Sequence, residues 1–583
     1  MSQKKNYDLH PSIAISSSQE DCALGWSKIF SKLKQVLPDA GKYVVAFECY
    51  PGVAIDRFVQ CLQAKFPAAD VLEMSTAYKD SSSLKAHFEP SLTEDPVFGV
   101  MRRADVGEYF DDARLDELKR RVEQTLGLTF LIGTGTAQAC SSEDLLVYAG
   151  VTRWELQRRQ RNHEIGNLGF DNADASAAVL YKNAFFLEWR VADAIRHSLF
   201  SRVSFFLDMD DEESPSMISG QTMRSAVSMV THRPFRVEPF FDPGPWGGQW
   251  MKQKFGLPDG PSNYAWCFDC VPEENAVSFM FGDRRFKLPA IMLVHEAPEA
   301  LLGRTVYERF GAEFPIRFDL LDTMDGGNLS LQVHPLTAYI KEHFGMDYTQ
   351  DESYYILDCK GLSHLYLGLA DSVDRDAMRD DLVAAQAGDI EFPAERYTSV
   401  WPTKKHDHFS IPAGTIHCSG QDNVVLEISA TPYIFTFKLW DWGRLGMDGN
   451  PRPIHLNRGL ENIQWNRDRS WVKKELMDQV SAVGGGPGWQ EERTGLHALE
   501  FLETRRTWFT EAVTYDTAGN LHVLNLVEGD AVIVESPNGS WEPYEIHYAE
   551  TFIVPAAVGR YTIRPLRKAE NPLGILQAYV RPS

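Results

Sequence analysis

Four side chains in the C-terminal half of the chain have the types and spacing of a scattered metal site: Gln332, His334, Glu352 and His417. Gln332 and His334 are two residues apart, so on a β-strand both side chains project from the same face. An amide, a carboxylate and two imidazoles suit a borderline divalent cation such as zinc, with a position left open for water or a substrate oxygen. The pattern predicts one Zn²⁺ per chain at a reactive site.

Chance is the alternative explanation, because the chain has 16 His residues and one Gln-x-His is a weak signal. The surroundings of the four residues favour a site. A Gly-Gly turn at residues 326–327 precedes Gln332, an apolar strand pattern contains Glu352, and a Pro-Ala-Gly turn at residues 412–414 leads to His417. It is the combination of these elements that predicts a shared metal.

The same segments resemble class I mannose-6-phosphate isomerases, which are metal-dependent aldose–ketose isomerases built on the cupin fold. Five ordered stretches carry the resemblance: residues 239–256 (PFFDPGPWGGQWMKQKFG), 329–335 (LSLQVHP), 352–359 (ESYYILDC), 411–417 (IPAGTIH) and 440–444 (WDWGR). The resemblance covers roughly residues 235–583. It implies that the four residues named above match the family's zinc ligands, and that Arg444 and Asp441 match the segment that supplies an active-site Arg and its acidic partner.

The residue types also fit the isomerase reaction, in which a proton moves between C1 and C2 of the sugar through an enediolate. Negative charge develops on the sugar oxygens, where a divalent ion acts as a Lewis acid while a positioned acid or base moves the proton. Arg444 could stabilise this charge or hold a phosphate, and its structural alternative is an ion pair with Asp441. Glu427 lies in an apolar strand pattern, so we expect it to face the pocket or to pair with a cation.

One departure from the family pattern concerns the substrate. The family usually carries a lysine two residues before the ligand Glu, and here that position is Gln350. Loss of this ammonium removes an acid/base participant or a contact to the sugar and its phosphate, so free mannose is an alternative substrate. A basic cluster just before the Pro-Ala-Gly turn either restores the charge or forms a solvated loop: Lys404, Lys405, His406 and His408.

An internal repeat predicts two β-barrels in tandem. The stretch FSIPAGTIH at residues 409–417 recurs as FIVPAAVGR at residues 552–560, and each copy follows short apolar strands. Arg560 takes the place of His417 in the second copy, and no Gln-x-His precedes it. We therefore expect the second barrel to bind no metal and to have a structural role.

The N-terminal part has a different sequence pattern, in which buried-strand patterns alternate with amphipathic segments. Such alternation predicts a parallel sheet with helices on its faces. The order resembles a uridine-kinase-like P-loop fold, but the stretch ECYPGVAID at residues 48–56 lacks the Lys and the hydroxyl of a working P-loop and carries carboxylates instead. The GTG sequence at residues 133–135 is either a tight turn or an anion site. We expect a degenerate kinase fold that serves as a regulatory or assembly module.

The predicted fold class is an α/β N-terminal domain with a parallel, P-loop-kinase-like sheet, followed by mainly-β tandem cupin (jelly-roll) barrels. The predicted domains are a degenerate kinase-like domain at residues 1–215, a metal-binding cupin domain at 216–450 and a metal-free cupin domain at 451–583. The first boundary rests on residues 210–219, where DDEESPS interrupts the apolar pattern.

Composition limits the partners and the compartment. The formal net charge of −23 disfavours nucleic acid and anionic membranes as partners. The N-terminus lacks a signal-peptide core and no run approaches about 18 apolar residues, so we expect a soluble, cytoplasmic protein. Eight Cys are too few for a disulfide scaffold, and Cys267 and Cys270 have metal-like spacing without a second pair.

Two classes of function compete. The first is a zinc-dependent isomerase that interconverts mannose 6-phosphate, or a related sugar or free mannose, with fructose 6-phosphate or the corresponding ketose. The alternative is a catalytically inactive sugar-binding protein, regulatory or structural, that kept the cupin pocket and its metal. Arg444 favours the enzyme, whereas Gln350 favours the binder or a changed substrate. A small-molecule sugar or sugar phosphate is the expected ligand in both.

Overall fold

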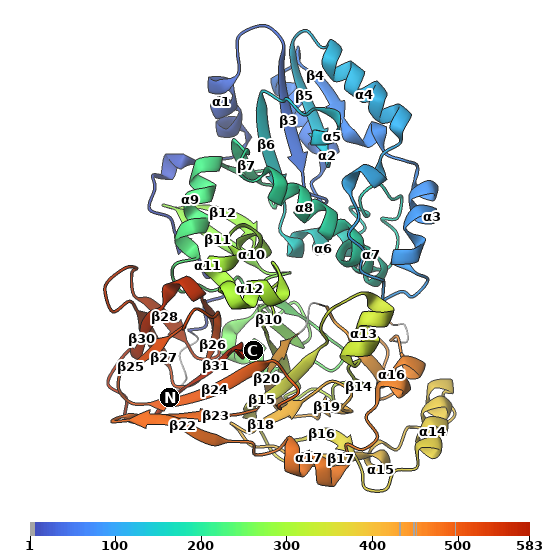
Figure 1. Cartoon of the computed structure of the whole chain (residues 1–583), viewed down its shortest axis with the longest axis vertical. Coiled ribbons are helices and arrows are strands. Elements are labelled where there is room, and N and C mark those ends of the chain that lie inside the picture. The colour runs from blue at the N-terminus through green and yellow to red at the C-terminus, as the bar shows by residue number, and fades with distance from the viewer. Residues whose placement is uncertain (1–5, 431–432, 447–448, 450–451, 496, 583) are drawn as a thin grey trace.

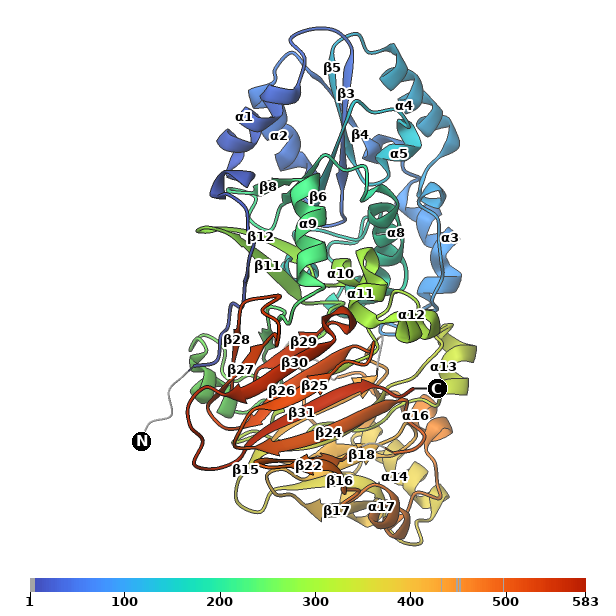
Figure 2. The same cartoon turned by 60° about the vertical axis from the view of Figure 1, so that its left-hand side comes forward.

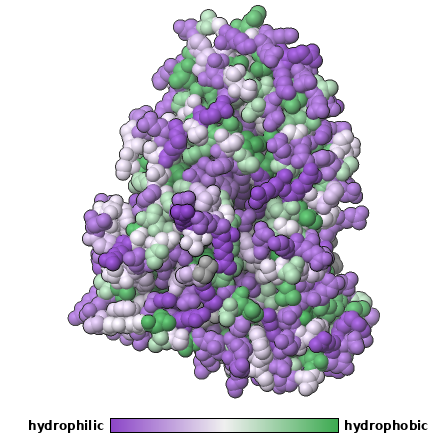
Figure 3. Space-filling view, in the orientation of Figure 1, coloured by the Kyte–Doolittle hydropathy of each residue, from purple (hydrophilic) through white to green (hydrophobic). Residues whose placement is uncertain are grey.

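An α/β half and a larger β-rich half lie one above the other along the long axis of the molecule (Figure 1). The computed structural model describes residues 6–582 except 431–432, 447–448, 450–451 and 496. The face seen in Figure 3 is mostly hydrophilic, with hydrophobic residues scattered over it, in keeping with the high net charge. Among the described residues no helix is both long enough and apolar enough to cross a membrane.

The α/β half is a twisted seven-stranded sheet with helices on its faces, and its central strands are parallel, as the sequence predicted. In spatial order its strands are β2 (Cys22–Leu24), β8 (Ser216–Ser219), β7 (Phe205–Asp208), β6 (Leu145–Gly150), β3 (Tyr43–Cys49), β5 (Leu128–Gly133) and β4 (Asp70–Glu73). Strands β4, β5, β3, β6 and β7 pair in parallel, and β8 and β2 add an antiparallel edge. The sheet thus continues past residue 215.

Helices cover this sheet because their apolar residues recur with helical spacing, as Phe58, Val59 and Leu62 do in α2. The helices are α1 (Trp26–Val36), α2 (Ile55–Lys65), α3 (Ser81–Leu92), α4 (Asp112–Gln124), α5 (Thr136–Ala139), α6 (Arg153–Arg161), α7 (Ala177–Asn183), α8 (Trp189–Leu199) and α9 (Gly220–Val230). Helices α6 and α7 lie at the lower end of this half, nearest to the β-rich half (Figure 1).

The β-rich half contains two pairs of antiparallel sheets, as expected for two barrels in tandem. One sheet of the first barrel is β18 (His408–Ile411), β15 (Asp351–Cys359), β20 (Asn423–Ala430), β13 (Arg317–Asp322), β10 (Trp266–Cys270) and β9 (Phe240–Asp242). Its other sheet is β17 (Thr398–Pro402), β16 (His364–Leu369), β19 (His417–Ser419), β14 (Leu331–Val333) and β21 (Phe437–Trp440). Around this barrel lie α13 (Thr337–Phe344), α14 (Arg375–Ala387), α15 (Ala394–Tyr397), α16 (Leu456–Asn462) and α17 (Arg469–Glu475).

The second barrel comes to the front in Figure 2. Its larger sheet is β22 (Ser481–Gly486), β23 (Trp489–Arg493), β24 (Leu502–Phe509), β31 (Leu573–Val580), β26 (His522–Glu528) and β29 (Thr551–Val554). Its smaller sheet is β25 (Val513–Asp516), β30 (Arg560–Pro565), β27 (Ala531–Glu535) and β28 (Tyr544–His547). The repeated sequence therefore occupies equivalent strand-turn-strand segments, β18 to β19 in one barrel and β29 to β30 in the other.

A small sheet and three short helices connect the halves. The sheet is β1 (Ile13–Ala14), β11 (Ala276–Phe281) and β12 (Arg284–Pro289), and the helices are α10 (Ile291–Glu296), α11 (Pro298–Leu302) and α12 (Arg304–Phe310). Strand β1 pairs in parallel with β11, so the N-terminal segment is itself tied to the small sheet, whose strands β11 and β12 lie between β10 and β13 of the first barrel in the chain.

Aromatic side chains pack the two halves together on the side of the first barrel. Phe98 of the α/β half lies against Phe344, Phe435 and Phe437, with ring centroids 5.3, 6.1 and 5.4 Å away. Tyr433 packs on Phe185, 4.5 Å away, and its hydroxyl donates to the carbonyl of Val97 at 2.7 Å. The segment 433–437 of the first barrel is therefore held by the α/β half.

Candidate metal centre

Three of the four predicted ligands converge inside the first barrel. Glu352 lies in β15, His417 begins β19, and His334 follows β14 directly; all three are fully buried. Their potential ligand atoms lie within 4.8 Å of one another. Glu352 contacts His334 Nε2 through Oε2 at 3.1 Å and His417 Nε2 through Oε1 at 2.8 Å. Gln332, the fourth, places its amide nitrogen 3.2 Å from His417 Nε2, so its side chain reaches the same point.

Backbone carbonyls orient both imidazoles. His334 Nδ1 lies 2.8 Å from the carbonyl oxygen of Phe435, and His417 Nδ1 lies 2.9 Å from that of Thr415. A carbonyl only accepts hydrogen bonds, so each Nδ1 carries a proton, and in the neutral imidazole Nε2 is the nitrogen that can offer a lone pair to a metal. This is the tautomer that a metal-binding histidine requires.

The donor set fits a divalent cation. Two imidazole Nε2 atoms and a carboxylate meet in a water-excluded space, where a divalent cation would accept a lone pair from each of them. His334 Nε2 and Glu352 Oε1 have no hydrogen-bond partner among the described residues. Two nitrogens and a carboxylate, with an amide oxygen available from Gln332, match the ligand preferences of zinc.

Gln350, which stands where the family usually has lysine, supports the centre from one side. Its Nε2 donates to Glu352 Oε2 at 3.0 Å, and its Oε1 accepts from the backbone N–H of Phe435 at 3.1 Å. The amide is thus committed to fixing the carboxylate of Glu352. Phe435 uses both of its backbone polar groups here, one on Gln350 and the other on His334.

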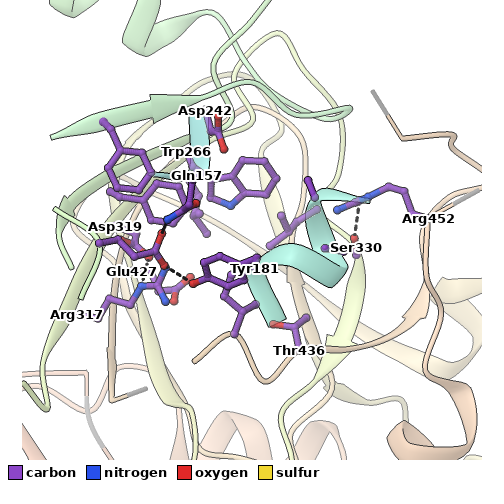
Figure 4. Close-up of a pocket in the computed structure, with 18 of the residues that line it drawn as sticks. Gln157, Tyr181, Asp242, Trp266, Arg317, Asp319, Ser330, Glu427, Thr436 and Arg452 are labelled. Carbon is purple, nitrogen blue, oxygen red and sulfur yellow. Dashed lines mark hydrogen bonds and ion pairs between the residues drawn. The ribbon is translucent and has the colours of Figure 1, made fainter. Parts of the chain in front are cut away.

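A cavity of about 390 Å³ adjoins the centre, and both Gln332 and Gln350 line it. Glu427 of β20 lines it too, so this buried carboxylate lies at the pocket. Burial, together with the negative charge of Glu352, raises the pKa of Glu427 well above its usual value. In Figure 4, Glu427 lies beside Arg317 and Asp319, which form an ion pair at 2.8 Å.

Arg444 and Asp441 form the ion pair that the sequence offered as the structural alternative to a catalytic role for Arg444. Arg444 Nη2 lies 2.6 Å from Asp441 Oδ1, and the guanidinium also donates to the carbonyl of Asn328. Asp441 further accepts from Ser330 Oγ at 2.9 Å and from Arg452 Nη1 at 2.7 Å. Arg452 and Ser330 line the cavity, whereas Arg444 is not among its lining residues. A catalytic role for Arg444 therefore stays a prediction, and Arg452 is a cation that sequence reasoning missed.

Lys438 is a second missed cation. Its register partner on β14 is Gln332, and paired residues of antiparallel strands face the same side, so its side chain projects into the cavity it lines. Burial, and then repulsion from Arg452, lowers the pKa of Lys438 to about 8. The predicted basic cluster lies elsewhere: Lys405 and His406 contact Glu528 of the second barrel. None of that cluster lines this cavity.

The Trp-Gly-Gly motif has a packing reason. Trp246 is buried and lines the cavity. A Cβ added at Gly247 would lie 2.1 Å from Asn263 Oδ1, and one added at Gly248 would lie 2.1 Å from Asp322 Oδ1. Both contacts are far below the distance of real Cβ atoms, so only glycine allows the chain to pass here and place the indole against the cavity.

In the α/β half, the anion-accepting turn is filled by the protein itself. The carboxylate of Glu48 accepts from the backbone N–H of Gly135 at 2.7 Å and from that of Thr136 at 2.8 Å. The Thr136 hydroxyl donates to the same carboxylate at 2.7 Å. Burial raises the pKa of Glu48 to about 7. An internal carboxylate thus occupies the donors that a phosphate would need, and the kinase-like assignment stays a prediction.

The remaining cysteine and histidine candidates form no comparable centre. Cys267 and Cys270 are free and buried. In the second barrel, His522 is buried, and its Nδ1 lies 2.9 Å from the hydroxyl of Tyr561. Among the described residues, His334, Glu352 and His417 form the only group of three or more His, Cys, Asp or Glu side chains placed to share a metal ion.

Known proteins resemble the two halves separately. The family model of a domain of unknown function (DUF8485) matches residues 25–232. The probable mannose-6-phosphate isomerase GmuF of Bacillus subtilis is 27% identical over 338 residues, which are 57% of this chain and 96% of that protein. The mannose-6-phosphate isomerase of Streptococcus mutans is 26% identical over 41% of this chain and 71% of its own length. These similarities support an isomerase, as the sequence predicted.

Among solved structures, the crystal structure of the mannose 6-phosphate isomerase from Bacillus subtilis matches with a TM-score of 0.48. It is 18% identical to this chain, and the match covers 60% of this chain and all of that one.

Proposed function

We propose that the protein is a metal-dependent aldose–ketose isomerase that acts on mannose 6-phosphate or on a closely related aldose such as free mannose. The observation that carries the proposal is a buried cluster of His334, Glu352 and His417 beside a sugar-sized cavity of about 390 Å³. The similarity of this half of the chain to curated isomerases supports the reaction class.

A divalent ion held by Gln332, His334, Glu352 and His417 would supply Lewis-acid stabilisation of the negative charge on the sugar oxygens. The chain's own residues do the rest. Gln350 and the carbonyls of Phe435 and Thr415 hold the ligands in place, so the centre is preorganised before the sugar arrives. His334, Glu352 and His417 are fully buried, so bulk water does not reach these side chains, which strengthens the charge interactions there.

Glu427 is the proposed proton carrier. Its carboxyl lines the cavity together with Gln332 and Gln350, where it can donate a proton to a sugar oxygen and later take one back. Lys438 is the proposed replacement for the lysine absent at position 350. Its buried ammonium lies across the strand pair from Gln332, where it can stabilise the enediolate oxygens.

Asp441, Arg444 and Arg452 are the proposed positioning group. Asp441 binds both guanidiniums and the Ser330 hydroxyl, so it fixes Arg452 at the cavity wall opposite Glu427 (Figure 4). In this arrangement Arg452, rather than Arg444, meets the substrate.

The test is ketose formation by zinc-reconstituted protein from mannose 6-phosphate and from mannose, side by side. His334→Ala is expected to lose bound metal and all turnover, because it removes a ligand that no neighbour replaces. His522→Ala is the matched control, since that buried histidine lies in the second barrel, and it should keep both metal and turnover. Bound zinc without turnover of any aldose would favour the inactive sugar-binding protein, and equal metal loss in both variants would refute the site.

A further inference from the structure

The cavity beside the metal centre is not built by the β-rich half alone. Helices α6 and α7 of the α/β half form one side of it, through Gln157, Gln160, Arg161, Ala177, Ala178 and Tyr181. Both helices lie within the match to the domain of unknown function. Their starts are well defined, because the hydroxyls of Thr152 and Ser176 accept from the third backbone N–H of each helix.

This wall is fixed to the β-rich half at several points. The two oxygens of Glu274 are held by the α/β half, one by the Tyr181 hydroxyl at 2.6 Å and the other by Gln157 Nε2 at 3.2 Å. At the end of α6, both terminal nitrogens of Arg161 donate to Asp242, each at 3.0 Å. A bidentate ion pair and a doubly bound carboxylate resist sliding of α6 and α7 over the barrel.

Polar groups without a protein partner line the same cavity. Gln160 is 2% exposed, and its Nε2 has no hydrogen-bond partner among the described residues. Trp246 Nε1 and Asp319 Oδ1 are likewise buried and without a partner in the part of the chain that the structure describes. A ligand that both donates and accepts, as sugar hydroxyls do, satisfies two N–H donors and a carboxylate oxygen at once.

A phosphate fits poorly beside these cavity-lining groups. Asp319 would repel it, and three of the cations that line the cavity are already paired with carboxylates: Arg161 with Asp242, Arg317 with Asp319, and Arg452 with Asp441. These groups therefore suit the neutral, hydroxyl-bearing part of a sugar.

We propose that the α/β half is a fixed wall of the sugar site, and that Gln160 donates a hydrogen bond from Nε2 to a sugar hydroxyl. This inference rests on the proposed function in taking the cavity as the sugar site, and it gives the α/β half a role in substrate recognition. It makes Gln160 a residue that contacts substrate without taking part in proton transfer.

The test is a kinetic comparison of wild-type protein, Gln160→Ala and Gln63→Ala, all full length and zinc-loaded. Gln63 lies exposed on α2 of the same half and controls for the substitution itself. Loss of one hydrogen bond should raise KM for mannose about threefold to tenfold in Gln160→Ala. Metal content and kcat should stay at wild-type values, because the amide nitrogen of Gln160 bonds to no described protein group.

Deoxy sugars identify the contact. The substrates are 3-, 4- and 6-deoxymannose, each of which lacks one hydroxyl. Wild type and Gln160→Ala should have the same KM for the deoxy sugar that lacks the hydroxyl bound by Gln160, because the hydrogen bond is then absent from both proteins. Equal KM values of the two proteins for mannose itself would refute the proposal that the α/β half forms a wall of the sugar site. If the wild-type protein turns over no aldose, the proposed function fails, and the role of Gln160 is then tested by calorimetric binding of mannose to the same proteins. Weaker binding to Gln160→Ala than to wild type supports the role of the α/β half in the sugar site. Equal binding to the two proteins, or no binding to either, refutes it.

Discussion

Replacing Asp193 with alanine is expected to be among the most damaging single substitutions in the α/β half. Asp193 lies in α8, between Arg153 of α6 and Arg196 of its own helix, and the side chains of all three are at least 94% buried. Burial by itself raises the pKa of Asp193, but the two guanidiniums outweigh it and hold that pKa well below its usual range. Without the carboxylate, two guanidiniums share a water-excluded space.

The magnitude follows from this burial. Removing one partner of a buried ion pair costs about 3–5 kcal/mol, because the remaining charge is left uncompensated. For a domain of about 200 residues, each kcal/mol lowers the melting midpoint by about 2–4 °C, so we expect a fall of about 6–20 °C. Since the folded-state pKa of Asp193 is depressed, its contribution is fully present above the ordinary Asp pKa of about 3.9 and is lost as the pH falls below it.

The assay is calorimetric or fluorescence-monitored melting at pH 7 and at low pH, with Asp116→Ala as the control. Asp116 pairs with Lys119 at 3.2 Å with the same three-residue spacing as Asp193 and Arg196, but its side chain is 67% exposed. We expect the control to cost less than about 1 kcal/mol. A fall for Asp193→Ala no larger than that of the control at pH 7 would refute the electrostatic reasoning.

Two further substitutions test packing and protonation. Gly248→Ala should lower the free energy of unfolding by about 1–3 kcal/mol, because the added Cβ would collide with Asp322 Oδ1, which is held by the backbone N–H of Met324 at 2.9 Å. Gly260→Ala is the control: nothing lies within 4 Å of its added Cβ, so it should be near neutral in the same melting assay. Burial, and then the charge of Asp210, raises the pKa of Asp208, so the folded protein keeps a proton that the unfolded chain releases at about 3.9. Wild-type stability should therefore decline as the pH rises from about 4 to 8, and Asp208→Asn should flatten that decline in urea titrations across this range; an unchanged slope would contradict the assignment.

The local features of the site could be read from the sequence. The sequence predicts a strand that contains Gln332 and His334 and a strand that begins at His417; in the structure Gln332 lies within β14, His334 follows that strand directly, and His417 begins β19. The repeat at residues 409–417 and 552–560 likewise predicts the two barrels. In both cases the signal is contained within a few consecutive residues.

The rest of the cavity depends on tertiary register and on the other half of the molecule. Lys438 reaches it because β21 pairs with β14 at Gln332, a register that no local pattern specifies. Gln160 reaches it because Tyr181 and Arg161 attach the α/β half to the barrel. In the sequence, Gln160 is one of several polar residues in a charged helix, and nothing marks it as a lining residue.

The attachment between the halves also bears on how the protein is made. A ribosome delivers the α/β half first, and N-terminal domains generally fold before the rest has emerged. Tyr433 then docks on Val97, 336 residues earlier in the chain, and Phe435 docks on Phe98. Phe435 in turn holds His334 and Gln350 through its backbone. We therefore expect the folded α/β half to order the segment that holds His334 and Gln350, so that the nascent chain completes its metal centre only after nearly all of the first barrel has been synthesised.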